Sequence, residues 1–330
     1  MPWAWVAEKA DARDLKSLEA RPRAGSIPAP GIWEPRSHEE FLSEIQGEVR
    51  IMYPEWALKW LEPREEVIRY GWKDVVLYAL GIGAGIEDLS FIYEGAPGGL
   101  KVYPSFAGLL AGSIVRDFVL EQDPPRVLHG EQHVRIKKPL PPEAEVRVKG
   151  RIKDVFDKGK AAVIHFLAEG RDSSSGESLF EVEHVAYYLG AGGFGGDPGP
   201  KSPKVEPPQG IEPDMTFVSP IPEVQAALYR LCGDLNPLHI DPEVARKVGF
   251  PKPILHGMCT YGYVTRAIVQ GLCEGDVSRF EEFRARFTDV VYPGDTLTTE
   301  AWSQGSGKYL LRVRTERGDV MGNAWARVLQ

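Results

Sequence analysis

The alternation of apolar and polar residues predicts two stretches of chain with the same order of elements. In the first stretch, apolar segments rich in small residues at 73–85 and 103–122 predict helices, the second one long and buried. Runs rich in valine and isoleucine follow, often alternate with polar residues and are separated by turn residues, which predicts antiparallel strands. These runs lie at 131–140, 144–156, 160–170 and 178–189.

The second stretch repeats this order. A small-residue-rich helix is predicted at 256–275, and strand-like runs fill 281–329. Segments 133–150 and 284–301 both consist of a strand, a turn marked by proline, an acidic residue and a second strand, so the stretches resemble diverged copies of one unit. A helix buried against an antiparallel meander gives an α+β layer. Two such units could join their edges into one sheet and cover the exposed strands.

Glycine and proline mark the boundary between the stretches. Residues 190–210 are too rich in both for regular structure, and they form the best linker candidate. In the N-terminal part, 37–52 predicts a short amphipathic helix with Ser37 as its N-cap, which we interpret as a docking arm or extra cover for a core. The predicted domains are an N-terminal extension at 1–62, a first unit at 63–195, a linker at 196–212 and a second unit at 213–330.

Composition narrows the class of protein. The chain has 330 residues, 43% of them hydrophobic and 26% charged, which is enough for two domains or one large one with an ordinary core. The net charge of -8 argues against a nucleic-acid partner, because phosphate binding needs a basic surface. The sequence has no apolar run long enough to cross a bilayer, so no membrane partner is expected.

The cysteines and the chain ends bear on location. The three cysteines are too few and too scattered for a disulfide framework or a zinc site, which favours a reducing compartment. The first residues carry too much charge for a secretory signal, and the last ones lack the usual peroxisomal tripeptide. A cytoplasmic location is therefore expected, with a peroxisomal one as the alternative in a eukaryote.

The sequence GDLNPLHID, residues 233–241, carries the candidate chemistry. Asp234 and His239 are five residues apart, which is the wrong spacing for one helix face. Pro237 also disfavours a helical conformation at Asn236, so a bent loop must bring the acid and the imidazole together. Such a pair can hold one water, remove a proton and deliver one, and the Asn236 amide can orient the water or brace the loop.

A purely structural role for this stretch has roughly even odds, since Asp, Asn and Pro are turn residues. Asp241 before Pro242 is also a good N-cap for a helix. The segment KPILHGMCTYG favours the functional interpretation, because Gly257 opens the second long helix. Helix starts carry unpaired N–H groups, and glycine permits close approach, so Gly257 N–H is a candidate oxyanion donor. From the residues alone, a glycine that serves only tight helix packing is at least as common as one that serves as an oxyanion donor.

Residues 227–262, ALYRLCGDLNPLHIDPEVARKVGFPKPILHGMCTYG, resemble the signature region of type 2, or MaoC-like, enoyl-CoA hydratases. In the first stretch YALGIGAG, LSFIYEG, LHGEQ, KPLP, DKGK and GAGGFGG resemble the hydratase part of peroxisomal multifunctional enzyme type 2. The resemblance runs from about residue 65 to the end, with many short motifs in the right order. Residues 1–62 lie outside it.

The resemblance implies a double hot-dog fold and reversible hydration of trans-2-enoyl-CoA to (3R)-3-hydroxyacyl-CoA, with no metal or redox cofactor. Asp234 and His239 would then be the catalytic pair, Asn236 their companion, and Gly257 the group that binds the thioester oxygen. Medium, long or bulky acyl chains and metabolism of the fatty-acid β-oxidation type are expected. A homodimer and a (3R)-hydroxyacyl-CoA dehydrogenase are the expected protein partners.

Further substrate or CoA contacts are implied by the resemblance alone. A lysine near nucleotide phosphates is electrostatically reasonable. From the residues alone, however, Lys158 is more typical of a solvated turn and Phe287 of core packing on a strand. The histidine on its own would more often be a structural hydrogen-bonding residue. The implied contacts are His129, Gly130, Lys158 and Phe287, with Glu94 and Tyr78 as weaker candidates.

The first stretch departs from the catalytic pattern. It has EDLSFIYEG where the second has GDLNPLHID, and YPSFAG where the second has HGM at the helix start. One active centre per chain is therefore expected, with the first unit shaping the acyl channel. The alternatives are a non-catalytic acyl-CoA-binding protein and a hot-dog thioesterase, because fold alone does not establish catalysis.

Overall fold

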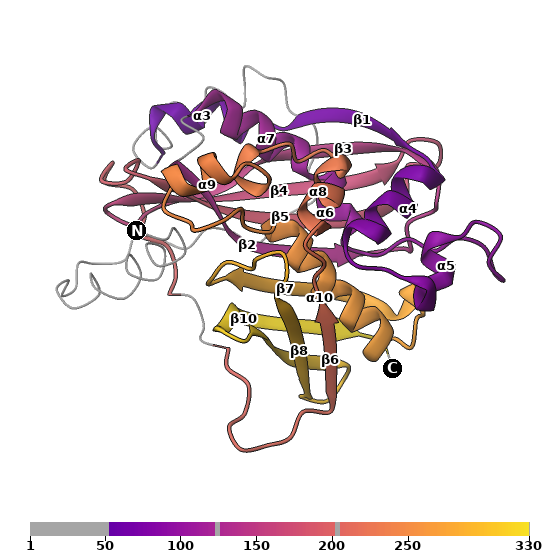
Figure 1. The fold of residues 1–330 in the computed structure, drawn as a ribbon. Coiled ribbons are helices and arrows are strands. Elements are labelled where there is room, and N and C mark those ends of the chain that lie inside the picture. The colour runs from indigo at the N-terminus through magenta and orange to yellow at the C-terminus, as the bar shows by residue number, and fades with distance from the viewer. Residues whose placement is uncertain (1–52, 123–125, 202–204, 330) are drawn as a thin grey trace.

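The computed structural model describes residues 53–122, 126–201 and 205–329, and their strands form one antiparallel sheet (Figure 1). Its order is β1-β3-β4-β5-β2-β7-β10-β9-β8-β6. Outward from the central β2–β7 pair, both halves follow the same order of their own strands, which confirms the internal repeat. The strands are β1 Arg64–Tyr70, β2 Val127–Ile136, β3 Ala144–Asp157, β4 Ala161–Asp172, β5 Ser178–Leu189, β6 Met215–Pro220, β7 Phe280–Phe287, β8 Thr296–Ser303, β9 Lys308–Thr315 and β10 Gly318–Val328.

Helices lie against this sheet (Figure 1). Helix α10 contacts β6 and β7, α6 contacts β2 and β5, and α3 contacts β3. The α-helices of the described residues are α3 Glu55–Leu61, α4 Trp72–Gly81, α5 Leu89–Ile92, α6 Phe106–Leu110, α7 Gly112–Glu121, α8 Gln225–Tyr229, α9 Pro242–Lys247 and α10 Gly257–Gly271; the 3-10 turns are η2 Ile86–Asp88, η4 Arg230–Cys232, η5 Pro237–His239 and η6 Val277–Arg279.

The helix predicted at 103–122 is interrupted. The structure has α6 and α7 there, with Ala111 between them at φ -75° and ψ -9°. Gly112 follows at the first position of α7, and glycine is a poor helix former because its backbone loses the most freedom on ordering. The corresponding helix of the second half, α10, is continuous over 15 residues and has most of its side chains buried.

The apolar core is continuous across the two halves. One cluster of buried residues includes Phe106 of α6, Tyr261 of α10 and Phe283 of β7. Tyr261 stacks on Phe283 with ring centroids 4.4 Å apart, and its hydroxyl donates to the Phe283 carbonyl oxygen at 2.5 Å. The continuity of the core means that neither half buries its apolar face by itself.

Polar contacts also join the halves. The Arg266 guanidinium in α10 donates to the Asp88 carboxylate at 2.7 Å, and both side chains are buried. The Gln225 amide in α8 donates to the carbonyl oxygens of Leu80 and Gly81 at the end of α4, at 2.9 and 2.6 Å. The last turn of α4 is thereby capped by the half that carries the candidate loop.

The sequence prediction missed the two edge strands, β1 and β6. Strand β1 exposes most of its polar side chains and β6 has six residues, so neither gives a clear apolar pattern. The described part of 190–210 contains no helix or strand, as expected. The helix predicted at 37–52 lies outside the described residues. In the described part of the chain, no helix is long and apolar enough to cross a membrane.

Candidate active site

The loop between α8 and α9 bends as its sequence predicts. Gly233 has φ 121°, a conformation that strongly favours glycine, and Asn236 has an extended ψ of 121° before Pro237. The Asp234 carboxylate accepts the Asn236 N–H at 3.1 Å, and the Asn236 side chain accepts the Leu238 N–H at 3.0 Å. Asn236 therefore braces the loop, and the Asp234 side chain stays exposed.

His239 is held at the end of this loop by a main-chain carbonyl. Its Nδ1–H donates to the Ile254 oxygen at 2.9 Å, which leaves the lone pair on Nε2. Burial lowers the pKa of His239 below its usual value, and the negative charge of Asp234 partly offsets that shift. The neutral imidazole can accept a proton through Nε2 near neutral pH.

His256 is a third polar group at the site, and the sequence analysis did not single it out as functional. It is 1% exposed and occupies the N-cap position of α10 without a side-chain capping hydrogen bond, and its Nε2–H donates to the Asp234 carbonyl oxygen at 3.2 Å. Its ring lies 3.9 Å from the His239 ring at 30°. Burial first, and proximity to His239 second, lower the pKa of His256 to about 4, against the attraction of Asp234. Its position before Gly257 was the available signal.

Gly257 is the first residue of α10, so its N–H has no acceptor within the helix. A Cβ atom at Gly257 would lie 3.6 Å from the Phe287 ring, which is ordinary contact. The structure thus places Phe287, from the end of β7, beside the helix start. The two residues named by the family motifs come together here from separate elements.

A β-bulge shapes the neighbouring part of β2. The β2–β5 register shifts between His129 and Glu131, so Gly130 is the extra residue. The His129 ring stacks on His184 at 3.6 Å and meets Phe287 edge-on at 4.7 Å. Burial lowers the pKa of His129 to about 4, and the nearby charge of Asp234 acts in the opposite direction. His129 and Gly130 therefore lie on the same side of the molecule as Asp234.

A buried ion-pair cluster fixes the strand seam next to this bulge. The Glu131 carboxylate, 7% exposed, accepts two hydrogen bonds from Arg286 at 2.7 and 2.8 Å and two from Arg284 at 2.9 and 3.3 Å. Burial alone would raise the pKa of Glu131, but the two guanidinium groups bring it below its usual value. Because Arg284 and Arg286 belong to β7, the cluster ties β7 to β2 where both approach the site.

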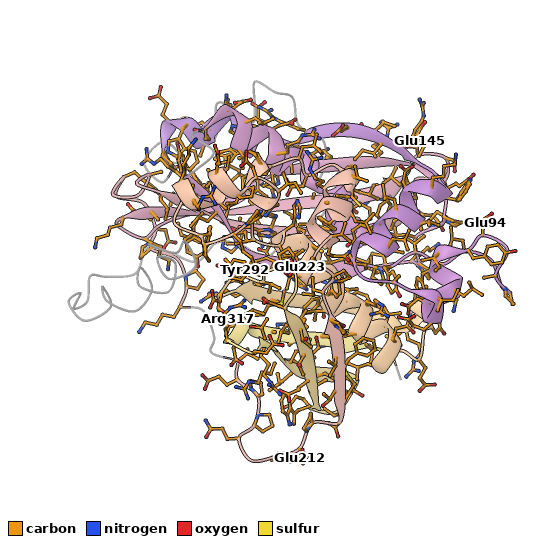
Figure 2. The ribbon with its side chains drawn as sticks, in the orientation of Figure 1. Glu94, Glu145, Glu212, Glu223, Tyr292 and Arg317 are labelled. Atoms are coloured by element: carbon orange, nitrogen blue, oxygen red, sulfur yellow. The ribbon has the colours of Figure 1, made fainter. Side chains whose placement is uncertain are left out.

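The remaining predicted residues are not all brought together. Lys158 lies in the β3–β4 turn, beside Asp157, whose carboxylate accepts the N–H groups of Gly193 and Gly195 at 2.8 Å. Tyr78 is buried in α4, with its ring 6.2 Å from Tyr229, which in turn lies 4.9 Å from the His256 ring. Glu94 lies on an exposed loop after α5, at the edge of the molecule (Figure 2).

A small pocket opens beside His239, with a volume of about 190 Å³. Glu223 is one of its lining residues, and Figure 2 labels Glu223 next to Tyr292, which lies in the loop between β7 and β8. The pocket connects one side of His239 with solvent. It is lined by Glu223, Ala226, Ala227, His239, Ile240, Lys252, Pro253 and Pro293, and so does not include Gly257.

The polar atoms of the site converge. One ligand-type atom from each of Asp234, His239 and His256 lies within 4.8 Å of the other two. That spacing allows the three side chains to share one water or one cation. With an exposed carboxylate and an imidazole lone pair this close together, the arrangement can accept a proton from water and return one to a bound molecule.

Two family models match most of the described chain. A model described as "MaoC like domain" matches residues 201–321, and one described as "MFE-2 hydratase 2 N-terminal domain" matches residues 68–190. The chain is 40% identical over 256 residues to "Enoyl-CoA hydratase ChsH3" of Mycobacterium tuberculosis, covering 72% of this chain and 86% of that protein. It is 39% identical over 255 residues to "Enoyl-CoA hydratase 2, peroxisomal" of Arabidopsis thaliana, covering 72% and 82%.

Solved structures agree with the fold. A MaoC-like dehydratase from Phytophthora capsici superposes with a TM-score of 0.75 at 30% identity, covering 83% of this chain and 98% of that one. A Mycobacterium tuberculosis protein whose structure is described as a double hot-dog fold superposes with a TM-score of 0.52 at 13% identity, covering 82% and 96%. The predicted α+β double hot-dog fold is confirmed.

Proposed function

This chain belongs to the MaoC-like enoyl-CoA hydratase 2 family and is a hydro-lyase, and we propose that it adds water reversibly to trans-2-enoyl-CoA to give (3R)-3-hydroxyacyl-CoA. The observation that carries the proposal is the convergence of Asp234 and His239 on one small volume. The substrate is an acyl-CoA thioester, and no metal or redox cofactor takes part in the reaction.

Asp234 and His239 hold the reacting water between them. The water oxygen bonds to C3, one O–H bond breaks, and C2 gains a proton, so the pair ends the reaction in its starting protonation state. The lone pair on His239 Nε2 and the open Asp234 carboxylate are both able to receive that proton. Asn236 supports the geometry by fixing the loop between them.

Gly257 binds the thioester oxygen. During addition, negative charge develops on that oxygen, and a free N–H at the positive end of α10 stabilises it. α10 has 15 residues, so its first N–H groups add to the field. The absence of a side chain at Gly257 leaves room for the thioester beside Phe287.

The substrate extends away from the catalytic loop in two directions. His129, Gly130, Phe287 and Lys158 contact the thioester arm and the CoA moiety. Tyr78 acts from the core behind Tyr229 and His256, and Glu94 acts indirectly through the position of its loop. These roles are supported by the family motifs, and for His129, Gly130 and Phe287 also by their nearness to Asp234 and Gly257.

The first unit, 63–195, shapes the acyl channel, and the second unit, 213–330, supplies the acid/base pair. The interrupted α6–α7 helix lies where the second half has its continuous helix α10. In this proposal the interrupted helix lines the acyl channel, and medium, long or bulky chains and metabolism of the β-oxidation type are the expected substrates and pathway. A homodimer, a (3R)-hydroxyacyl-CoA dehydrogenase partner and the cytoplasmic location belong to the same proposal.

The test is the loss of enoyl-thioester absorbance with crotonyl-CoA and a longer enoyl-CoA, together with chiral analysis of the product. Asp234→Asn and His239→Gln should each reduce kcat by roughly 100-fold or more. The matched control is Asp241→Asn in the same segment, because asparagine also caps α9 and should leave the rate unchanged. A folded wild-type chain that hydrates no enoyl-CoA of any length overturns the proposal.

Two other activities are separated by the same assay. A thioesterase would release free CoA, which a thiol reagent detects while the hydroxyacyl product stays absent. An acyl-CoA-binding protein would bind the thioester tightly without turnover. The convergence of Asp234 with His239 favours hydration over both, since binding alone needs no acid/base pair.

A further inference from the structure

We propose that Asp234, His239 and His256 form a binding site for Zn²⁺, and that the ion inhibits the enzyme by occupying the place of the reacting water. Their donor atoms lie within 4.8 Å of one another, and the residues come from the loop, from η5 and from the start of α10. Two imidazoles and a carboxylate are a donor set that zinc accepts, with a fourth position left open.

Each imidazole has one ring nitrogen that does not take part in its hydrogen bond to a main-chain carbonyl and can face an ion. His239 keeps the lone pair of Nε2 because its Nδ1–H donates to Ile254. In His256, Nε2 is bonded to the Asp234 carbonyl, and buried Nδ1 has no hydrogen-bond partner.

Each ring is also held in place from outside. A metal-binding histidine usually donates its other ring N–H to a carbonyl or carboxylate oxygen, which fixes the ring and its tautomer. His239 has this arrangement with the Ile254 oxygen at 2.9 Å, and His256 has it with the Asp234 oxygen at 3.2 Å. Both rings are therefore held in one orientation before an ion arrives.

Access comes from the carboxylate side. Asp234 is exposed, and only one of its carboxylate oxygens accepts the Asn236 N–H, so the other can bind a cation that arrives from solvent. An ion there displaces the water that would add to C3. His239 Nε2 would then be bonded to the ion and could not accept a proton, so hydration stops while Zn²⁺ is bound.

Zn²⁺ binding is tested directly on the untagged, chelator-treated full chain by calorimetry at neutral pH without substrate. One ion per chain is expected, and Asp234→Asn, His239→Gln and His256→Gln should each weaken the affinity at least tenfold. The control His133→Gln removes an imidazole that is bonded to Glu282, outside this site, and should leave the affinity unchanged. Unchanged affinity in all three site variants overturns the proposal.

A second measurement on the unmodified chain does not depend on how the variants fold. X-ray absorption at the zinc edge should show two imidazole ligands with oxygen ligands, and sulfur ligands would place the ion elsewhere and overturn the site. In the hydration assay Zn²⁺ should lower the apparent kcat for crotonyl-CoA, with recovery on adding a chelator. The inhibition rests on the proposed function, but the binding does not, so a chain that binds Zn²⁺ and lacks hydratase activity would contradict the function alone.

Discussion

Gly130 lies so close to Tyr187 that a Cβ atom on the glycine would come within 2.2 Å of the tyrosine ring. Gly130→Ala should therefore displace Tyr187 or flatten the bulge, and either change moves His129. We expect a loss of about 1–3 kcal/mol in the free energy of unfolding and a raised KM for enoyl-CoA. Denaturant titration and steady-state kinetics measure both effects.

The control for this substitution is Gly112→Ala. A Cβ atom at Gly112 meets no heavy atom within 4 Å, and the residue starts α7. Alanine should stabilise the helix by about 0.5 kcal/mol and leave the KM for the short substrate crotonyl-CoA unchanged. If both variants behave alike, the contact with Tyr187 is not what requires glycine at position 130.

His256 should position the loop that carries Asp234 through its hydrogen bond to the Asp234 carbonyl. His256→Gln can keep a donor at that point, whereas His256→Phe keeps a ring against His239 but has no donor. A loop displaced by about 1 Å can cost roughly 100-fold in rate, so kcat should fall that far in the phenylalanine variant and less than tenfold in the glutamine variant. Equal losses in both, or a change in KM alone, would contradict this role.

The buried pair Arg266–Asp88 should affect stability mainly because either buried charge is costly without its partner. Arg266→Met leaves the buried Asp88 carboxylate without the guanidinium that it pairs with. We therefore expect a loss of about 3–5 kcal/mol in the free energy of unfolding. The double variant Arg266→Met with Asp88→Leu should recover most of it. As a control, Arg69→Met breaks an exposed pair with Glu145 and should cost less than about 1 kcal/mol.

The free energy of unfolding should decrease as the pH is lowered from about 6.5 to about 4. Burial lowers the pKa of His129 and of His256 to about 4 and that of His184 well below its usual value. In that interval the unfolded chain binds protons on these imidazoles and the folded chain does not, so lower pH favours unfolding. Each imidazole should add a slope of up to roughly 1.4 kcal/mol per pH unit. Denaturant titrations at several pH values, with His184→Gln for comparison, test this.

The sequence predicts those parts of the fold that have a strong local pattern. The runs at 144–156 and 178–189 correspond closely to β3 and β5, and Asp241 caps α9 as expected, accepting the Glu243 N–H at 2.8 Å. The edge strand β1 was missed because its solvent-facing residues weaken alternation. The break at Ala111 was missed because its neighbours are apolar and continue the helical pattern on both sides.

At the site, the local sequence is enough to predict the loop with Asp234 and His239, but the residues packed around that loop are known only from the fold. GDLNPLHID contains its own turn chemistry, which explains why Asp234 and His239 could be named together. His256 is 22 residues from Asp234 in the sequence, and its bond to the Asp234 carbonyl depends on where α10 begins. The Glu131 cluster forms because β2 pairs with β7, which is far away in the sequence. Nothing in the sequence around Glu131 indicates that pairing.

The central pairing of β2 with β7 has a consequence for how the two units could have diverged. Either unit made alone would end in a bare strand edge and would be prone to pair with a copy of itself. When the two units are joined in one chain, the pairing of β2 with β7 becomes intramolecular and is therefore favoured over the pairing of a unit with its own copy. A gene fusion of this kind frees one partner from symmetry, so a substitution in one copy need not appear in the other.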